Sequence, residues 1–236
     1  MSERVGEARA GGVRRRFGRI AATYDLVNRL MTAGQDQRWR RDAIRRLDLP
    51  GSPRVLDLGA GTGDFSFETL AQRPAARLVA VDITPEMIRR GRARPGGRPV
   101  RWVVGDAANL PFPAASFDGV VSGFLLRNAP DLEQVLAEQS RVARPGSRFA
   151  CLETTPPRGS WWLPLVRFYL HVVVPALGRL VAGEREAYTY LTRSTEAFVP
   201  AEALAEIMRT AGFEQVGFVR KGLGTVAIHW GAKSGS

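Results

Sequence analysis

The sequence predicts an α/β fold built on a doubly wound, mostly parallel sheet, and two observations support this prediction. In the stretch Val55–Asp64, four residues of β-type pattern run into a Gly-x-Gly-x-Gly turn, and a helix start follows. A strand, a glycine-rich turn and a helix form the ligand-binding loop of doubly wound sheets. Beyond residue 50, short apolar runs alternate with helical patterns, which is typical of parallel β-α-β units.

Two helices are expected within Phe17–Arg46, ahead of the first strand. Apolar residues fall at helical spacing in two groups, Phe17, Ile20, Tyr24 and Trp39, Ala43, Leu47. A break around residues 32–34 separates the two helices, and Pro50–Pro53 forms a turn before the first strand. Residues 1–12 are polar and rich in Gly, Ala and Arg, so we expect a frayed tail there.

Strands and helices then alternate along the chain. We expect strands at 55–58, 78–81, 100–104, 117–121 and 148–152, and helices at 65–72, from residue 85 onward and at 132–142. Thr84 followed by Pro85 is a typical N-cap and first helical residue. The Pro145-Gly146 pair ends the helix at 132–142 and precedes the fifth strand.

Composition and charge limit the class of protein. The chain has 236 residues, enough for one buried core, and a net charge of +11. Such a charge favours an anionic partner, either nucleic acid or a membrane surface, and equally fits a solvated arginine-rich face. A single cysteine, Cys151, excludes an internal disulfide and a cysteine-based zinc site. Because no signal peptide or long apolar run is present, we expect a cytoplasmic protein, soluble or peripheral at the inner face of a membrane.

The glycine turn also narrows the choice of ligand. In the dinucleotide fingerprint Gly-x-Gly-x-x-Gly, the last glycine would stand where this chain has Asp64. A carboxylate at the helix start repels a pyrophosphate. A Gly-x-Gly-x-Gly turn preceded by Asp57 suits S-adenosylmethionine, a sulfonium cation without phosphates, and resembles motif I of the Rossmann-like methyltransferases. An ordinary tight turn in an unrelated α/β protein is the alternative.

Acidic residues follow the next two strands as well. Asp82 ends the second strand, where a carboxylate can accept two ribose hydroxyls, and Asp106 ends the third, where it can accept from an adenine amino group. Each aspartate alone is more often a helix cap, but three acidic strand ends beside the glycine turn indicate a methyl-donor site. The predicted cofactor-binding residues are Gly59, Gly61, Thr62, Asp82, Asp106 and Ala107, and no metal ligand is expected.

This sequence lacks the catalytic residues that nucleic-acid methylation requires. The loop at 122–128 has no Asn/Asp-Pro-Pro-aromatic element of the adenine and cytosine amino methylases. Cytosine C5 chemistry needs a Pro-Cys nucleophile, whereas Cys151 follows Ala150. Despite the basic charge, no nucleic-acid partner is expected.

Several segments resemble the ubiquinone/menaquinone C-methyltransferases (the UbiE/MenG family). They are Phe17–Thr32, Gly34 through Trp39-Arg40, Gly123–Asp131, Arg141–Gly146, Leu152–Thr154, Phe168-Tyr169 with His171, Pro175, Leu177–Arg179, Tyr188, Tyr190-Leu191, Ala211–Phe213 and Val226–His229. The chain departs from the family pattern at Val27, Thr32, Asp36, Ala60 and Ser147. The departure at Asp36 matters most, because the family carries a histidine there and histidine is the usual titrating base near pH 7.

The resemblance implies methyl transfer from S-adenosylmethionine to a ring carbon of a prenylated hydroquinone. Arg127 is the candidate for stabilising the phenolate that activates the carbon, and its alternative role is an ion pair with Asp131. His171 is the candidate base, in an apolar stretch that favours a neutral imidazole, and its alternative is a hydrogen-bonded core histidine. Tyr24 is expected on a helical lid over the cofactor, unless it is an ordinary core tyrosine.

Together these features predict a Rossmann-like fold with a helical N-terminal arm or lid at 1–50, a methyltransferase domain at 51–236 and a C-terminal antiparallel strand pair. Demethylmenaquinol is the first candidate acceptor, a ubiquinone precursor the second and another lipid-like small molecule the third. A basic nucleic-acid-binding protein that holds S-adenosylmethionine without turnover is the alternative of another class. Candidate partners are the quinol, a membrane surface and a second copy of the chain.

The most apolar stretch, residues 161–175, is expected to form the wall of a tunnel for the prenyl tail or to rest at a membrane surface. Trp161 and Trp162 would lie at its rim. Pro164, Arg167 and Pro175 interrupt it too much for a bilayer span, and a core helix pair is the alternative.

Overall fold

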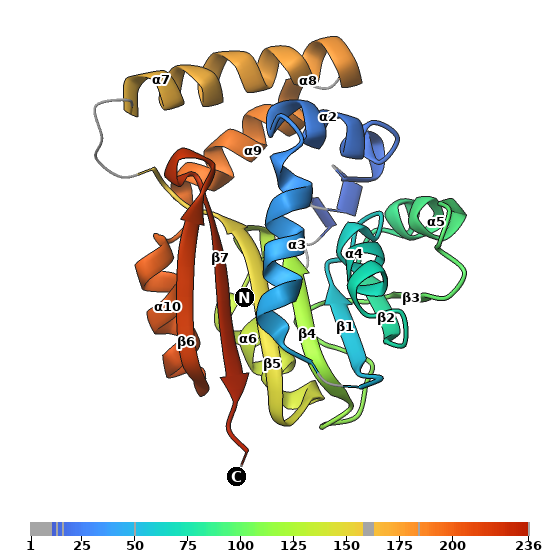
Figure 1. The fold of residues 1–236 in the computed structure, drawn as a ribbon. Coiled ribbons are helices and arrows are strands. Elements are labelled where there is room, and N and C mark those ends of the chain that lie inside the picture. Colours follow the sequence, from blue (N-terminus) through green and yellow to red (C-terminus); the bar gives the residue numbers. More distant parts are fainter. Residues whose placement is uncertain are drawn as a thin grey trace.

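One sheet organises the part of the chain that the computed structural model describes, which is residues 11–12, 14–15, 17–49, 51–157, 163–183 and 185–235. Its strand order is β3-β2-β1-β4-β5-β7-β6 (Figure 1). The strands are β1 Arg54–Leu58, β2 Arg77–Asp82, β3 Arg101–Val104, β4 Phe117–Gly123, β5 Ala143–Thr154, β6 Phe213–Lys221 and β7 Val226–Lys233. Strands β1 to β5 pair in parallel, and β7 runs antiparallel to both β5 and β6. The predicted sheet and its C-terminal antiparallel pair are confirmed.

Helices cover both faces of this sheet. They are α2 Tyr24–Met31, α3 Gln35–Leu47, α4 Asp64–Gln72, α5 Pro85–Ala93, α6 Leu132–Val142, α7 Leu163–Phe168, α8 Val174–Ala182, α9 Arg185–Ala197 and α10 Ala201–Thr210. Alternate residues of a strand point to opposite faces. Accordingly, Leu56 packs in a core with α6 and α10, whereas its neighbour Val55 packs in a second core with α3 and α4.

The N-terminal region contains one more break than the sequence predicts. The expected break is present, because Ala33 and Gly34 adopt φ angles of 48° and 72°, which end α2. A second turn at residues 21–23 separates the helical segment 17–20 from α2, and there the Thr23 backbone N–H donates to the Ile20 carbonyl at 3.0 Å.

Helix α3 belongs to the sheet core, whereas α2 does not. Trp39, Ala43 and Leu47 of α3 are buried against the sheet in the same core as Val55. By contrast, Val27 of α2 is buried in a separate cluster against α8. Residues 17–49 therefore divide between α3, which packs on the sheet, and an arm, residues 17–31, that lies above the sheet (Figure 1).

From Leu163 onward the apolar stretch forms one continuous helix, contrary to the expectation that its prolines interrupt it. Helices α7 and α8 are joined without a break by a π turn at Tyr169–Val173. Pro175 follows this turn, and the wider π turn accommodates a residue that lacks an N–H and crowds the preceding turn. The helix Leu163–Val181 has the length and composition of a membrane span, a test that core helices of soluble proteins also pass. Trp161 and Trp162 lie outside the described residues.

Candidate functional site

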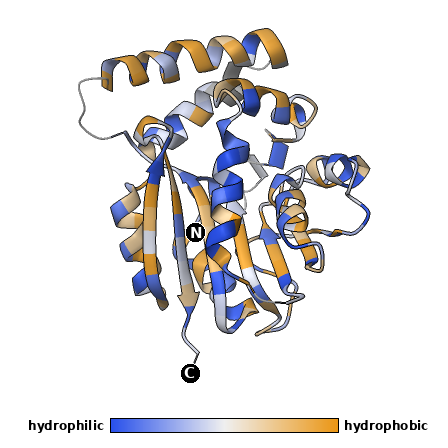
Figure 2. Cartoon of the chain, in the orientation of Figure 1, coloured by the Kyte–Doolittle hydropathy of each residue, from blue (hydrophilic) through white to orange (hydrophobic). Residues whose placement is uncertain are grey.

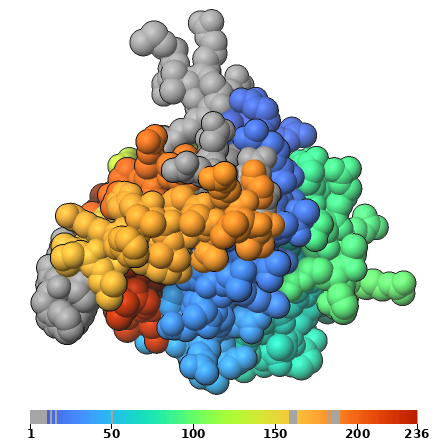
Figure 3. All heavy atoms as spheres, turned by 90° about the horizontal axis from the view of Figure 1, so that it is seen from above, coloured from blue at the N-terminus to red at the C-terminus, as the bar shows by residue number. Residues whose placement is uncertain are grey.

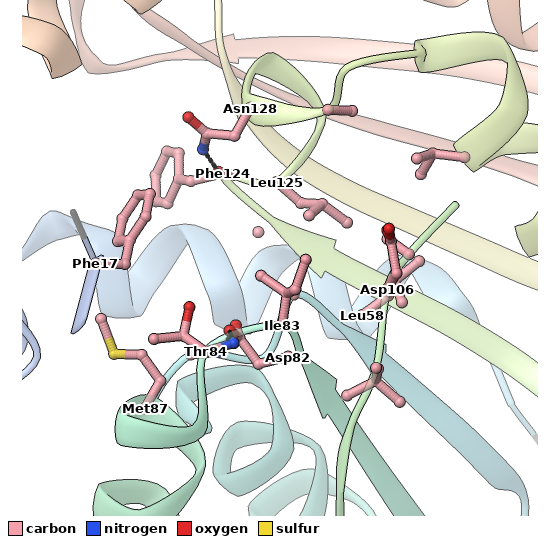
Figure 4. Close-up of a pocket in the computed structure, with 18 of the residues that line it drawn as sticks. Phe17, Leu58, Asp82, Ile83, Thr84, Met87, Asp106, Phe124, Leu125 and Asn128 are labelled. Carbon is pink, nitrogen blue, oxygen red and sulfur yellow. Dashed lines mark hydrogen bonds between the residues drawn. The ribbon is translucent and has the colours of Figure 1, made fainter. Parts of the chain in front are cut away.

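A pocket opens at the carboxyl ends of the parallel strands, where doubly wound sheets bind ligands (Figure 4). Phe17 and Tyr24 of the arm close one side of it. The remaining lining residues come from the strand ends and the loops after them: Leu58, Gly59, Gly61, Val81–Thr84, Met87, Gly105–Ala107, Gly123–Leu125, Asn128–Pro130 and Val135. The surface is mostly apolar, with the carboxylates of Asp82 and Asp106 placed at two strand ends.

The glycine turn needs glycine for two different reasons. Gly59, Gly61 and Gly63 all have positive φ angles, of 68°, 55° and 91°. Residues other than glycine rarely adopt such angles. A Cβ atom on Gly59 would lie 2.8 Å from Leu125 Cδ1, so close packing excludes one there. A Cβ on Gly61 would meet nothing within 4 Å. Gly61 therefore turns an open backbone face to the pocket, and a ligand can approach it closely.

Asp82 is held at the end of β2 by two backbone donors. Its Oδ2 atom accepts from the Gly61 N–H and its Oδ1 atom from the Thr84 N–H, both at 2.8 Å. Burial raises the pKa of Asp82, and these two hydrogen bonds oppose the rise. Thr84 occupies the N-cap position of α5, but its side chain makes no capping hydrogen bond. The carboxylate of Asp82 thus ties the glycine turn to the start of α5 while facing the pocket.

The other two predicted aspartates behave differently. Asp106 and Ala107 line the pocket, and Asp106 Oδ1 accepts from the Ala108 N–H at 2.9 Å. Asp57 does not line it. The Asp57 Oδ2 atom accepts from both the backbone N–H and the hydroxyl of Ser66, at 2.9 and 2.7 Å, and burial raises the pKa of this carboxyl to about 7. Two acidic strand ends therefore face the pocket, and the third anchors the first turn of α4.

Thr62 connects the glycine turn to the arm. Its hydroxyl is buried, lies outside the pocket lining and donates to Asp25 Oδ1 at 2.6 Å. Arg94, at the end of α5, donates to the Thr62 carbonyl at 3.1 Å and to Asp64 Oδ1 at 2.7 Å, and lies 3.4 Å from Asp25 Oδ2. Sequence reasoning missed both Asp25 and Arg94. Asp25 lies within a family-like segment, whereas no motif marks Arg94.

Arg127 is buried and paired, but with another partner than the one proposed. Its Nη1 atom donates to Glu153 Oε1 at 2.6 Å, and both side chains are almost fully enclosed. Asp131 instead caps α6 by accepting from the Gln134 N–H at 2.9 Å, so the ion pair with Asp131 is not formed. The Arg127 guanidinium lies 5.2 Å from the centre of the Phe124 ring, which lines the pocket. Arg127 therefore does not line the pocket itself but lies directly behind the lining residue Phe124.

His171 lies apart from this cluster. It is on the π turn, half-exposed, with its Nε2 atom 2.8 Å from Glu196 Oε1 of α9. Its ring is absent from the pocket lining, and its surroundings are neither the apolar ones nor the core that the sequence suggests. The structure thus brings together Gly59, Gly61, Asp82, Asp106 and Ala107 in the pocket lining, with Arg127 behind it, but not His171.

Tyr24 lies at the pocket and also in an apolar cluster. The residue lines the pocket from the arm, and its ring also packs edge-on against Phe17 in a cluster with α8, at 5.8 Å between ring centres. Burial raises the pKa of the Tyr24 phenol, while the positive charges of Arg127 and Arg40 lower it. Phe17 is a second lining residue of the arm, and both its helical spacing with Tyr24 and the family-like segment that it begins mark it in the sequence.

Comparison with known sequences gives one consistent result. The model of the ubiE/COQ5 methyltransferase family matches residues 3–233. A Desulfotalea psychrophila protein named ubiquinone/menaquinone biosynthesis C-methyltransferase UbiE is 44% identical over 94% of this chain and 90% of that protein. A demethylmenaquinone methyltransferase of Roseiflexus sp. RS-1 is 42% identical over 97% of this chain and 96% of that protein. A demethylmenaquinone methyltransferase of Thermus thermophilus is 43% identical over 91% of this chain and 98% of that protein.

Solved structures resemble the fold at much lower sequence identity. A SAM-dependent methyltransferase from Thermotoga maritima superposes with a TM-score of 0.65 at 21% identity, covering 94% of this chain and 99% of that one. A phosphoethanolamine N-methyltransferase of Haemonchus contortus, solved with S-adenosyl-L-methionine, has a TM-score of 0.63 at 14% identity and covers 84% of this chain and 52% of that one. These likenesses show a Rossmann-like methyltransferase fold.

Proposed function

This chain belongs to the ubiE/COQ5 methyltransferase family, and from that membership we propose that it transfers a methyl group from S-adenosylmethionine to a ring carbon of a prenylated hydroquinone. It is an S-adenosylmethionine-dependent C-methyltransferase. The observation that carries the proposal is the match to named C-methyltransferases over nearly their whole length. Demethylmenaquinol is the first candidate acceptor, because several of these relatives are named for it. A ubiquinone precursor is the second, because other relatives are named for both quinones.

The pocket residues fit the cofactor. Gly61 leaves room beside its backbone, and each Asp82 oxygen accepts a single backbone hydrogen bond, so lone pairs remain for two ribose hydroxyls. We assign adenine to the side of Asp106 and Ala107. When bound, S-adenosylmethionine supplies an electrophilic methyl group on a sulfonium sulfur. Thr62 acts on this site through the shape of the glycine turn, because its hydroxyl is bonded to the arm.

The acceptor ring is placed beside Tyr24 and Phe124, on the arm side of the pocket. A neutral aromatic carbon is a weak nucleophile, and ionisation of a neighbouring phenol, whose pKa is about 10, moves electron density onto it. The fixed charge of Arg127 lowers the pKa of the Tyr24 phenol. An acceptor phenol at the same place experiences the same field. Arg127 is therefore proposed to stabilise the phenolate from behind the pocket wall.

The proposal is tested with purified protein, methyl-labelled S-adenosylmethionine and a set of reduced acceptors. The set contains a demethylmenaquinol, a ubiquinone precursor and a tailless naphthoquinol. We expect label on a ring carbon of the naphthoquinols and a lower rate with the ubiquinone precursor. Cofactor binding without transfer to any quinol would reject the proposed reaction. Because prenylated quinols are lipids, we also propose that the protein works in the cytoplasm, at the inner face of a membrane.

A further inference from the structure

An apolar surface lies on the side of the molecule above the pocket, on the helix formed by α7, the π turn and α8. Leu165, Phe168, Val172 and Leu180 on this helix are exposed by 66%, 56%, 50% and 82%. Their spacing of three, four and eight residues places them along one side of a helix. Figure 2 shows the hydrophobic colour along this helix, and Figure 3 shows it running across the molecule seen from above.

Helix α2, beside α8, carries further exposed apolar residues. It packs against α8, and its Leu26 and Leu30, one helical turn apart, are also strongly exposed. Another side of each helix is already used, because Val27 of α2 and Val174 of α8 are buried in the cluster between the two helices. We call the six residues Leu26, Leu30, Leu165, Phe168, Val172 and Leu180 the apolar face. Large exposed apolar patches mark interaction surfaces, since water penalises them in a free monomer.

The charges around the apolar face are mostly positive. Arg167 and Arg179 are exposed on the same helix, and Arg29 is exposed between the two leucines of α2. The sequence from 163 to 182 contains no Asp or Glu, and the whole chain carries a net charge of +11. Within the part of the chain that the structure describes, Glu196 meets this helix and is paired with His171. Apolar side chains with arginines beside them match the interface of an anionic bilayer, where acyl chains lie beneath negative headgroups.

The same helix leads to the pocket through its inner side. Its Val174, with Tyr169 and Leu170, packs in one apolar cluster that also contains Phe17 and Tyr24. Phe17 and Tyr24 line the pocket. A continuous apolar layer therefore connects the inner side of this helix to the proposed acceptor position.

From these contacts we propose that the apolar face docks on the surface of an anionic membrane and that the lipid acceptor enters the pocket beneath α7 and α8. The helix lies in the plane of the interface, because its inner side stays packed on α2 and α9. The docking itself is independent of the proposed reaction. Only the passage of the acceptor depends on the proposed function.

The test is flotation of the full-length protein with vesicles. One set contains phosphatidylcholine alone, and the other contains phosphatidylcholine mixed with phosphatidylglycerol. We expect the protein to float with the mixed vesicles, and a Leu165→Ser/Phe168→Ser/Leu180→Ser variant to bind them about tenfold less tightly or worse. Arg167→Gln/Arg179→Gln should weaken binding to the mixed vesicles and reduce its sensitivity to salt.

A matched control comes from another edge of the sheet. Val104 on β3 is 53% exposed and is not part of the apolar face, so Val104→Ser should float like the unchanged protein. Equal thermal unfolding of all variants shows that folding is intact. Methyl transfer to a tailless acceptor in solution should stay unchanged in the triple variant, whereas transfer to a long-tailed acceptor in vesicles should fall.

Three results would overturn the docking proposal. They are absence of flotation with the mixed vesicles, equal flotation of the triple variant, and a stable dimer that the triple variant converts to a monomer, which would assign the face to a second copy. In each case, transfer to the tailless acceptor still reports on the proposed function. Flotation with no transfer to any quinol would reject the reaction and leave docking standing.

Discussion

At the scale of single residues, Asp82 holds the glycine turn by two backbone hydrogen bonds and is also proposed to bind the cofactor. The Asp82→Ala change removes the acceptor for two ribose hydroxyls, and we expect S-adenosylmethionine to bind about 2–3 kcal/mol more weakly, because two charge-assisted hydrogen bonds are lost. The variant also leaves the Gly61 and Thr84 N–H groups without their acceptor, so its melting temperature should fall. Calorimetry measures the affinity. An unchanged affinity would reduce Asp82 to the anchor of the glycine turn.

The buried pair of Arg127 and Glu153 makes a single substitution misleading. Arg127→Leu leaves Glu153 enclosed without its partner and should cost about 3–5 kcal/mol of folding stability. Arg127→Leu/Glu153→Leu should recover most of that loss, because no unpaired charge remains. We expect turnover to stay low in the double variant while cofactor affinity is unchanged. Normal turnover in a stable double variant would show that Arg127 only pairs with Glu153.

Two buried groups give opposite pH dependences to stability. Burial lowers the pKa of His229 from 6.5 to about 4, so between these values the unfolded chain binds a proton that the folded chain does not. The contribution of His229 is therefore lost as pH falls through this range. Burial raises the pKa of Asp57 from 3.8 to about 7, so here the folded chain holds the extra proton, and stability is lost as pH rises.

We expect these two effects to offset each other in the unchanged protein between about pH 4 and pH 6.5. In His229→Phe only the Asp57 effect remains, so the free energy of unfolding should fall as pH rises. In Asp57→Asn only the His229 effect remains, so the free energy of unfolding should fall as pH drops. Each change should amount to roughly 3 kcal/mol across the range. Denaturant unfolding at several pH values measures the slopes. Parallel profiles for the two variants would contradict this account.

At the scale of elements, the arm is fastened to the glycine turn by a small polar network. Arg94 bonds Thr62 and Asp64 and lies near Asp25 of α2. Arg94→Gln should loosen the arm by about 1 kcal/mol, because the pairs are only partly buried, and should speed cofactor release roughly fivefold. Stopped-flow dissociation and limited proteolysis of the arm measure the effect. Arg89→Gln, which breaks an exposed pair with Glu86 on the same helix, should change neither rate.

At the scale of the whole molecule, the sheet topology collects the functional elements on one side. The carboxyl ends of β1 to β4 lie at the same edge, and the arm and the α7–α8 helix lie above that edge (Figure 1). The proposed cofactor site is thus formed by strand ends, and the arm forms the side proposed for the acceptor. In this proposal, a lipid that approaches from the apolar face reaches the methyl donor without crossing the sheet.

The sequence by itself determined the features that depend on a few neighbouring residues. Strand and helix alternation, the positive φ of Gly61 and the acidic residues at the ends of β2 and β3 are local properties, and the structure contains all of them. The family motifs added the chemistry. Such features are predictable because backbone sterics and side-chain period act within one turn or one strand.

Only the tertiary structure decided which distant side chains meet. Arg127 pairs with Glu153, which is 26 residues away, although Asp131 is nearer in sequence. His171 faces Glu196 outside the pocket, although its stretch is apolar. The exposure of Leu180 likewise depends on which side of its helix the arm covers. These outcomes follow from the way whole helices and strands pack together. Burial and charge pairing depend on contacts between segments that are far apart in the sequence, and the local sequence pattern carries no information on those contacts.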